Sequence, residues 1–74
     1  MPKLPSLSGK ELVHVLERNG FTAVRQRGSH VILVKQGQTG KRATVVSLHA
    51  ELDKGTLLEI LRQAGLSRND LTRP

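Results

Sequence analysis

Two leucine stripes, one towards each end of the chain, constrain its fold more than any other feature. Each follows a helix start in which a hydrophobic residue precedes the capping residue and another stands four positions beyond it. The first helix is predicted over residues 8–19, with Ser8 and Glu11 as a capping box, and the second over residues 54–64, capped by Asp53. Both helices need a surface on which to bury their leucines.

A third start of the same kind follows the second helix. Ser67 and Asp70 have the spacing of a capping box, and Leu71 takes the hydrophobic position. Because little chain remains after it, we expect only a short, frayed turn there.

The segment between the two main helices is rich in β-branched and alternating residues, which predicts strands. They are expected over residues 21–26, 30–35 and 41 or 42–47, with a turn at 27–29 and a loop at 36–40. Short connections favour an antiparallel meander. The predicted fold class is α+β: a two-layer α-β-β-β-α sandwich with two helices on one face of a three-stranded antiparallel sheet. At 74 residues we expect a single domain, residues 1–74.

Charge is unevenly distributed along the chain, whose formal net charge is +6. All acidic residues lie before Arg18 or after Ala50, and the stretch between these positions holds only basic ones. These are Arg18, Arg25, Arg27, Lys35, Lys41 and Arg42. A block free of carboxylates predicts a polyanion-binding face, although it is also compatible with a merely soluble surface. With Phe21 as the single aromatic residue, a base-stacking platform is not expected.

Several other classes of function are disfavoured. The chain has no cysteine, which excludes disulfides, thiolate metal sites and a cysteine nucleophile. Histidines and carboxylates lack metal-ligand spacing, so we expect neither metal nor cofactor. The longest apolar run, Val31 to Val34, is too short to cross a bilayer, and no secretory signal is recognisable, so we expect a cytoplasmic protein without membrane contact.

The three histidines differ in their surroundings. His14 points away from the leucine stripe of the first helix, and we expect no function for it. His30 follows a Gly-Ser turn and opens a strand, a position where a rigid scaffold can present a side chain to a ligand. Its place in the sequence alone leaves a structural role open. His49 lies between the third strand and the second helix, where a structural role is favoured over a catalytic one.

Several runs along the chain resemble the HicA (YcfA-type) family of mRNA interferases. They are Ser-Gly-Lys-Glu-Leu at 8–12, Asn-Gly-Phe at 19–21, Arg-Gln-Arg-Gly-Ser-His at 25–30, His49, Lys-Gly-Thr-Leu at 54–57 and Ile-Leu-Arg-Gln-Ala-Gly-Leu-Ser at 60–67. A departure is Ser47, where many relatives have proline, and this affects the expected geometry around His49.

The resemblance implies a toxin with a fold like that of double-stranded-RNA-binding domains (dsRBD-like). Such a toxin cleaves mRNA, is neutralised by a HicB-like antitoxin and depends on a histidine that corresponds to His30. We expect His30 to act as a general base, with His49 as a candidate auxiliary group. The toxin is expected to be a monomer when it is free of its antitoxin. The expected RNA-binding residues are Arg25, Arg27, Gly28, Ser29, Lys41 and Arg42. Arg25, Arg27 or Lys41 would stabilise the charge that develops on the phosphate.

Two alternatives remain open at this point. The order of elements is that of a double-stranded-RNA-binding domain, so the chain is also compatible with a non-enzymatic RNA-binding module. Against this, Lys54 is the only lysine where such domains carry a cluster, at the start of the second helix. The other alternative is a protein-interaction domain whose basic surface holds an acidic partner.

Overall fold

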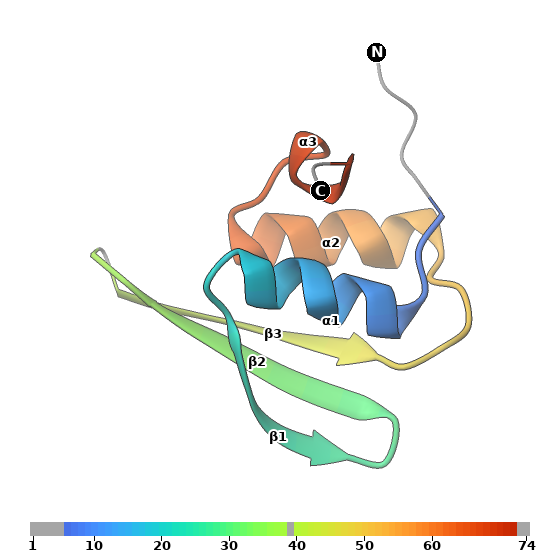
Figure 1. Ribbon diagram of the computed structural model, residues 1–74, viewed down its shortest axis with the longest axis horizontal. Helices are drawn as coiled ribbons and strands as arrows, with labels where there is room; N and C mark the ends of the chain where they lie inside the picture. Colours follow the sequence, from blue (N-terminus) through green and yellow to red (C-terminus); the bar gives the residue numbers. More distant parts are fainter. Residues whose placement is uncertain (1–5, 39, 73–74) are drawn as a thin grey trace.

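Two helices, α1 (Gly9–Arg18) and α2 (Lys54–Ala64), lie side by side on one face of a three-stranded sheet (Figure 1). The computed structural model describes residues 6–38 and 40–72. The sheet is antiparallel in the order β1-β2-β3. Its strands are β1 (Thr22–Arg27), β2 (His30–Gly37) and β3 (Gly40–Ser47), and a short helix, α3 (Asn69–Thr72), follows α2. The predicted α-β-β-β-α sandwich is confirmed.

Helix α1 begins and ends with the motifs expected from the sequence. The Ser8 N–H donates to Glu11 Oε1 (2.9 Å), and the Glu11 N–H donates to Ser8 Oγ (3.1 Å), which completes a capping box. At the other end Gly20 has a φ of 93°, and the Phe21 N–H donates to the Leu16 carbonyl (3.0 Å). This closure folds Phe21 back into the core, so the first strand begins one residue later than predicted.

Helix α2 is also bounded as predicted. Asp53 accepts a hydrogen bond from the Thr56 N–H (3.3 Å), and the chain leaves the helix at Gly65, whose φ is 72°. The Leu66 N–H then donates to the Leu61 carbonyl (2.9 Å), which turns the chain back over the last turn. Beyond it Leu71 of α3 is buried, so the final turn is anchored to the core, whereas we expected it to be frayed.

Alternation along β2 and β3 separates a buried face of the sheet from an open one. Val31, Leu33 and Val46 are buried towards the helices, whereas His30 and Val45 are exposed on the opposite face. The ladder between these strands runs out to the pair Gly37 and Gly40, so the predicted loop at 36–40 is shorter than expected. We expected residues 36–40 to form the loop, but β2 extends to Gly37 and β3 begins at Gly40.

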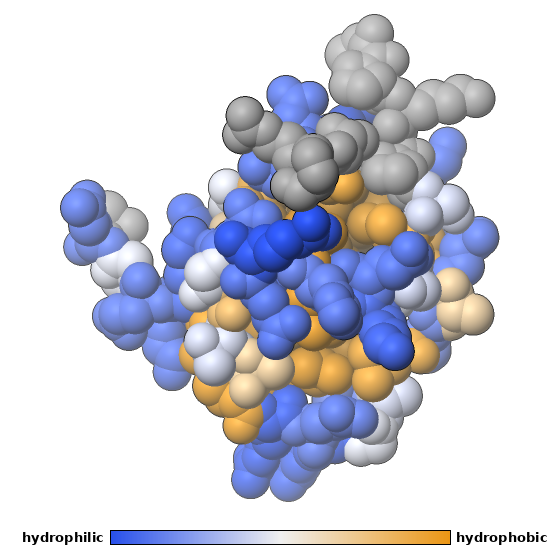
Figure 2. Space-filling model, viewed as in Figure 1, coloured by the Kyte–Doolittle hydropathy of each residue, from blue (hydrophilic) through white to orange (hydrophobic). Residues whose placement is uncertain are grey.

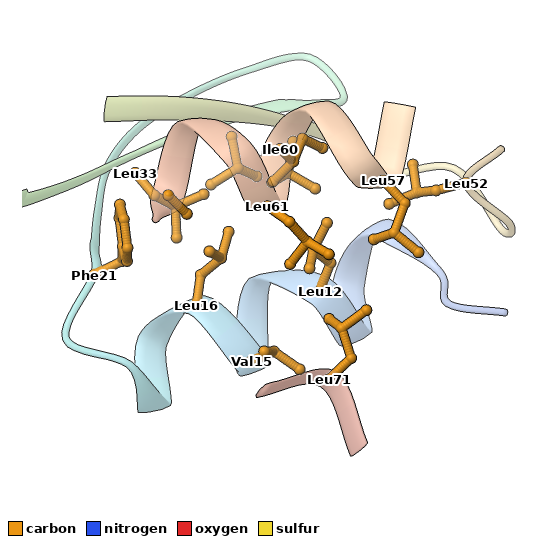
Figure 3. Packing of buried hydrophobic residues seen from close by; sticks show 13 residues of the cluster. Leu12, Val15, Leu16, Phe21, Leu33, Leu52, Leu57, Ile60, Leu61 and Leu71 are labelled. Atoms are coloured by element: carbon orange, nitrogen blue, oxygen red, sulfur yellow. The ribbon is translucent and has the colours of Figure 1, made fainter. Parts of the chain in front are cut away.

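The core lies between the helices and the covered face of the sheet (Figure 3). Its members are Leu12, Val15, Leu16, Phe21, Val31, Leu33, Val46, Leu52, Leu57, Ile60, Leu61, Ala64 and Leu71. Leu12, Leu16 and Leu33 have no exposed surface, and truncation of such leucines to alanine typically costs about 2–5 kcal/mol. In Figure 2 hydrophilic residues cover the projecting ends of the sheet, and apolar residues concentrate where the helices meet it.

Candidate functional site

His30 stands at the first position of β2, directly after the two-residue turn Gly28-Ser29. Gly28 has a φ of 56°, and Ser29 has no positive φ, as in a type II′ hairpin turn with glycine at its first central position. The turn is held on two sides: Gln26 Nε2 donates to the Gly28 carbonyl (3.0 Å), and the Leu48 N–H donates to the Ser29 carbonyl (2.7 Å). The backbone that presents His30 is therefore fixed by hydrogen bonds.

A row of three residues crosses the sheet at this position. Arg27 of β1 pairs with His30, and His30 pairs with Ser47 of β3. Residues directly opposite one another in antiparallel strands share a face, with Cβ atoms typically about 5 Å apart. Since neighbouring Val31 is buried towards the helices, this row lies on the open face. Arg27 and His30 are exposed and Ser47 is half-buried.

An irregularity in β1 brings a second arginine to the same face. The register shifts between Ala23 and Arg25, so that Val24 is an extra residue and Arg25 pairs with Ile32. Strict alternation from Ala23, which pairs with buried Leu33, would have turned Arg25 towards the helices. Such a bulge redirects side chains. It thus brings Arg25 and Arg27 to the open face with His30, an arrangement that alternation along β1 does not predict.

Two of the expected RNA-binding residues lie elsewhere. Lys41 pairs with Gln36 on the open face, six residues along β3 from Ser47 and therefore about 20 Å from His30 at about 3.3 Å per residue. Arg42 lies on the helix face, where its Nη1 donates to the Gln63 carbonyl (3.3 Å). The structure does not bring either residue to His30.

His49 lies just beyond β3, at the same end of the sheet as the Gly28-Ser29 turn. Its side chain is exposed, and its carbonyl accepts a hydrogen bond from the Gly9 N–H (2.9 Å). Gly9 makes this contact because it has no side chain: a Cβ there would collide with the Ser47 carbonyl oxygen and lie 2.8 Å from Leu48 Cα. The start of α1 therefore fixes the chain that leads from Ser47 to His49.

The contacts of three residues at this end of the sheet were not predicted from the sequence. Ser47 faces His30, Gln26 holds the turn, and Gly9 packs against the end of β3. Register could have identified Ser47, because a two-residue turn and a short hairpin loop fix which residues are opposed. The contacts of Gly9 and Gln26 depend on tertiary packing and have no local signal.

The described residues contain no group of three or more metal-ligating side chains, and no described helix is long and apolar enough to cross a membrane. Strands β1, β2 and β3 contain no carboxylate, and at the start of α1 backbone and side-chain hydrogen bonds with Ser8 lower the pKa of Glu11. The open face around His30 is consequently basic, and its arginines and histidine are accessible to a ligand.

Fold and site together define a small, basic domain of dsRBD-like α-β-β-β-α architecture with a histidine and two arginines on its open sheet face. A family model described as the HicA toxin of bacterial toxin–antitoxin systems matches residues 9–66, which is most of the chain. The protein belongs to the HicA toxin family. This membership implies pairing with an antitoxin. No curated protein matches the chain.

Proposed function

We propose that this toxin is an endoribonuclease that cleaves mRNA, with His30 as its catalytic residue. The observation that carries the proposal is the bulge at Val24, which turns Arg25 and Arg27 to the face occupied by His30. A base and two cations on one accessible surface are groups that can promote cleavage of RNA by its own 2′-hydroxyl.

In the proposed reaction the neutral imidazole of His30 removes the proton from a ribose 2′-hydroxyl. The 2′-oxygen then attacks the adjacent phosphorus in line, and the bond from phosphorus to the 5′-oxygen breaks. The products are a 2′,3′-cyclic phosphate and a 5′-hydroxyl, the latter protonated by water or by His49. A positioned base of this kind typically contributes about 10²–10⁴-fold to the rate.

Arg27, in the same row as His30, and Arg25, one row further along β1, would stabilise the negative charge on the phosphorane-like transition state. Lys41, expected to share this role, is too distant and would instead contact RNA backbone beyond the scissile phosphate. Base and charge stabilisation both come from side chains, so the proposed reaction requires no metal.

The proposed inhibitor is a HicB-like antitoxin that covers this open face. Val45 is 48% exposed there, and Val24, the extra residue of the bulge, is 56% exposed, which gives a protein partner apolar area to bury near the cations. RNA and antitoxin would then compete for one surface in the cytoplasm.

The mechanism is tested with an RNA that carries a single 2′-deoxynucleotide at a mapped cleavage position. Cleavage should stop at that position and continue elsewhere, because the attacking oxygen is missing, and the products elsewhere should end in a 2′,3′-cyclic phosphate. Unchanged cleavage at the modified position would contradict the mechanism. If RNA is bound with no cleavage at any position, the chain is a non-enzymatic RNA-binding module.

A further inference from the structure

β3 is an edge strand of the sheet, and no other described strand pairs with its outer edge. The Leu48 N–H points towards β2, where it donates to Ser29, and the alternation of an antiparallel ladder therefore turns the N–H and C=O groups of Lys41, Ala43 and Val45 outwards. Within residues 6–38 and 40–72, Ala43 and Val45 make no backbone hydrogen bond on that side.

The two edges of the sheet differ in how they are protected. Edge strands are commonly blunted by bulges and charged residues, and β1 has both, at Val24 and at its arginines. Along β3 the charged residues stand at the hairpin end, and the stretch Ala43-Thr44-Val45 is neutral. The backbone of this stretch is therefore open to pairing with another strand.

A groove of about 630 Å³ runs between this edge and α2. Ala43, Thr44 and Val45 form its sheet side, and α2 with its cap forms the other, largely through Thr56, Ile60 and Gln63. The Thr44 hydroxyl donates to Gln63 Oε1 (2.8 Å) and ties the two walls together. A groove between a free strand edge and a helix is the geometry in which peptides bind by strand addition.

The carboxylates that line the groove indicate which kind of peptide would bind there. Among the described residues, the ionisable ones that line it are Asp53 and Glu59, both carboxylates, and Glu59 also forms an ion pair with the exposed Arg62. Hydrogen bonds from Thr56 lower the pKa of Asp53, and a hydrogen bond from Arg62 lowers that of Glu59, so both are ionised at neutral pH. Asp53 forms no ion pair among the described residues, so its charge favours basic side chains over RNA, while Glu59 offers a carboxylate that it already shares with Arg62.

We propose that the groove between β3 and α2 binds an extended polypeptide segment with basic side chains, which adds to the sheet as a fourth strand. Main-chain hydrogen bonds to Ala43 and Val45 would hold the segment, and its alternate side chains would face Asp53 and Glu59 on the helix side. The groove shares no residue with the row of Arg27, His30 and Ser47, so peptide binding there can be tested independently of the proposed nuclease activity.

The first test uses three capped six-residue peptides and the ¹H–¹⁵N spectrum of the full chain. One peptide alternates lysine and valine, the second alternates glutamate and valine, and the third is a scrambled sequence with the lysines adjacent. The lysine–valine peptide should shift the amide signals of Ala43 and Val45, and the glutamate–valine peptide should not, because like charges would oppose it.

N-methylated peptides test strand addition directly. Two versions of the lysine–valine peptide are made, one methylated at every lysine nitrogen and one at every valine nitrogen. In an added strand, alternate N–H groups face β3, so one version should bind about tenfold more weakly or worse, because it loses its backbone hydrogen bonds, while the other binds normally. Equal binding by both versions would overturn the proposal.

Two charge reversals provide a matched comparison. Glu59→Lys places a cation in the groove, whereas Glu17→Lys changes the net charge equally on α1, outside it. Affinity for the lysine–valine peptide should fall only in the Glu59→Lys chain. Three results would overturn the proposal: no binding of the peptide, equal loss in both chains, or dilution-dependent shifts of Ala43 and Val45 without peptide. The last would assign the edge to a second copy of the chain.

Discussion

Ser47 is the residue whose role changes most between sequence and structure. In the sequence it is only a departure from the family resemblance, whereas in the fold it stands opposite His30 on the open face. The Cβ atoms of opposed residues are typically about 5 Å apart, so the Ser47 hydroxyl is within reach of the His30 imidazole or of a bound ribose. Ser47 is therefore a candidate positioning residue for His30.

We predict that Ser47→Ala lowers kcat about fivefold to tenfold with little change in KM, since one hydrogen bond is typically worth about 1 kcal/mol. Ser47→Thr retains a hydroxyl and should keep most of the activity. To test this, we would measure the single-turnover cleavage rate, its pH dependence and the RNA affinity of both variants. If the alanine variant cleaves like the unchanged chain, Ser47 has no part in positioning His30.

At the scale of elements, α1 and β3 are joined by a backbone contact that only glycine permits. The Gly9 N–H donates to the His49 carbonyl, and a Cβ at Gly9 would lie 2.8 Å from Leu48 Cα. Overpacking against backbone cannot be relieved by a rotamer change, so the helix and the end of the strand must separate. Stability and the placement of His49 therefore depend on the same contact.

Gly9→Ala should destabilise the fold by about 2–3 kcal/mol. Gly55→Ala is the matched control: it lies in the first turn of α2, where a Cβ would make only an ordinary 3.4 Å contact with the Asp53 side chain, and should stabilise by about 0.5 kcal/mol through helix propensity. Urea unfolding of the three chains gives the comparison. Equal urea midpoints for Gly9→Ala and Gly55→Ala would show that the close contact at Gly9 does not affect stability.

Local signals in the sequence predict the elements well but not how their side chains are directed. The starts of α1 and α2 are marked by capping hydrogen bonds within one turn, made by Ser8, Glu11 and Asp53. The observed bounds of both helices are therefore close to the predicted ones. The bulge at Val24 is different, because its position depends on which registers let both strands bury their apolar residues. The same dependence on neighbours explains why Arg42 lies on the helix face of the sheet, where it donates to the Gln63 carbonyl of α2.

At the scale of the whole molecule, the open face and the groove beside α2 differ in the ionisable residues that line them. The open face carries Arg25 and Arg27, and the groove beside α2 carries Asp53 and Glu59. The two proposals therefore assign polyanions and basic peptides to different surfaces of the same chain.

This division predicts how RNA affinity depends on salt. Arg27→Gln should weaken RNA binding and reduce the slope of log affinity against log salt by about 0.7, the value for one phosphate contact on a single strand. Arg18→Gln removes the same charge from the end of α1 and should leave the slope unchanged. Filter binding across a range of salt concentrations measures both. Equal slopes for the two variants would mean that RNA does not bind at the open face.

The central claim is that His30 is the catalytic base, and paired histidine substitutions test it most directly. The full chain, His30→Ala and His14→Ala are incubated with end-labelled RNA in EDTA, and the cleavage rate and the RNA affinity of each are measured. His14 is exposed on α1 outside the row, so His14→Ala should cleave normally. His30→Ala should bind RNA but cleave it about 100-fold more slowly or worse. Cleavage by His30→Ala at the rate of the unchanged chain would contradict the account.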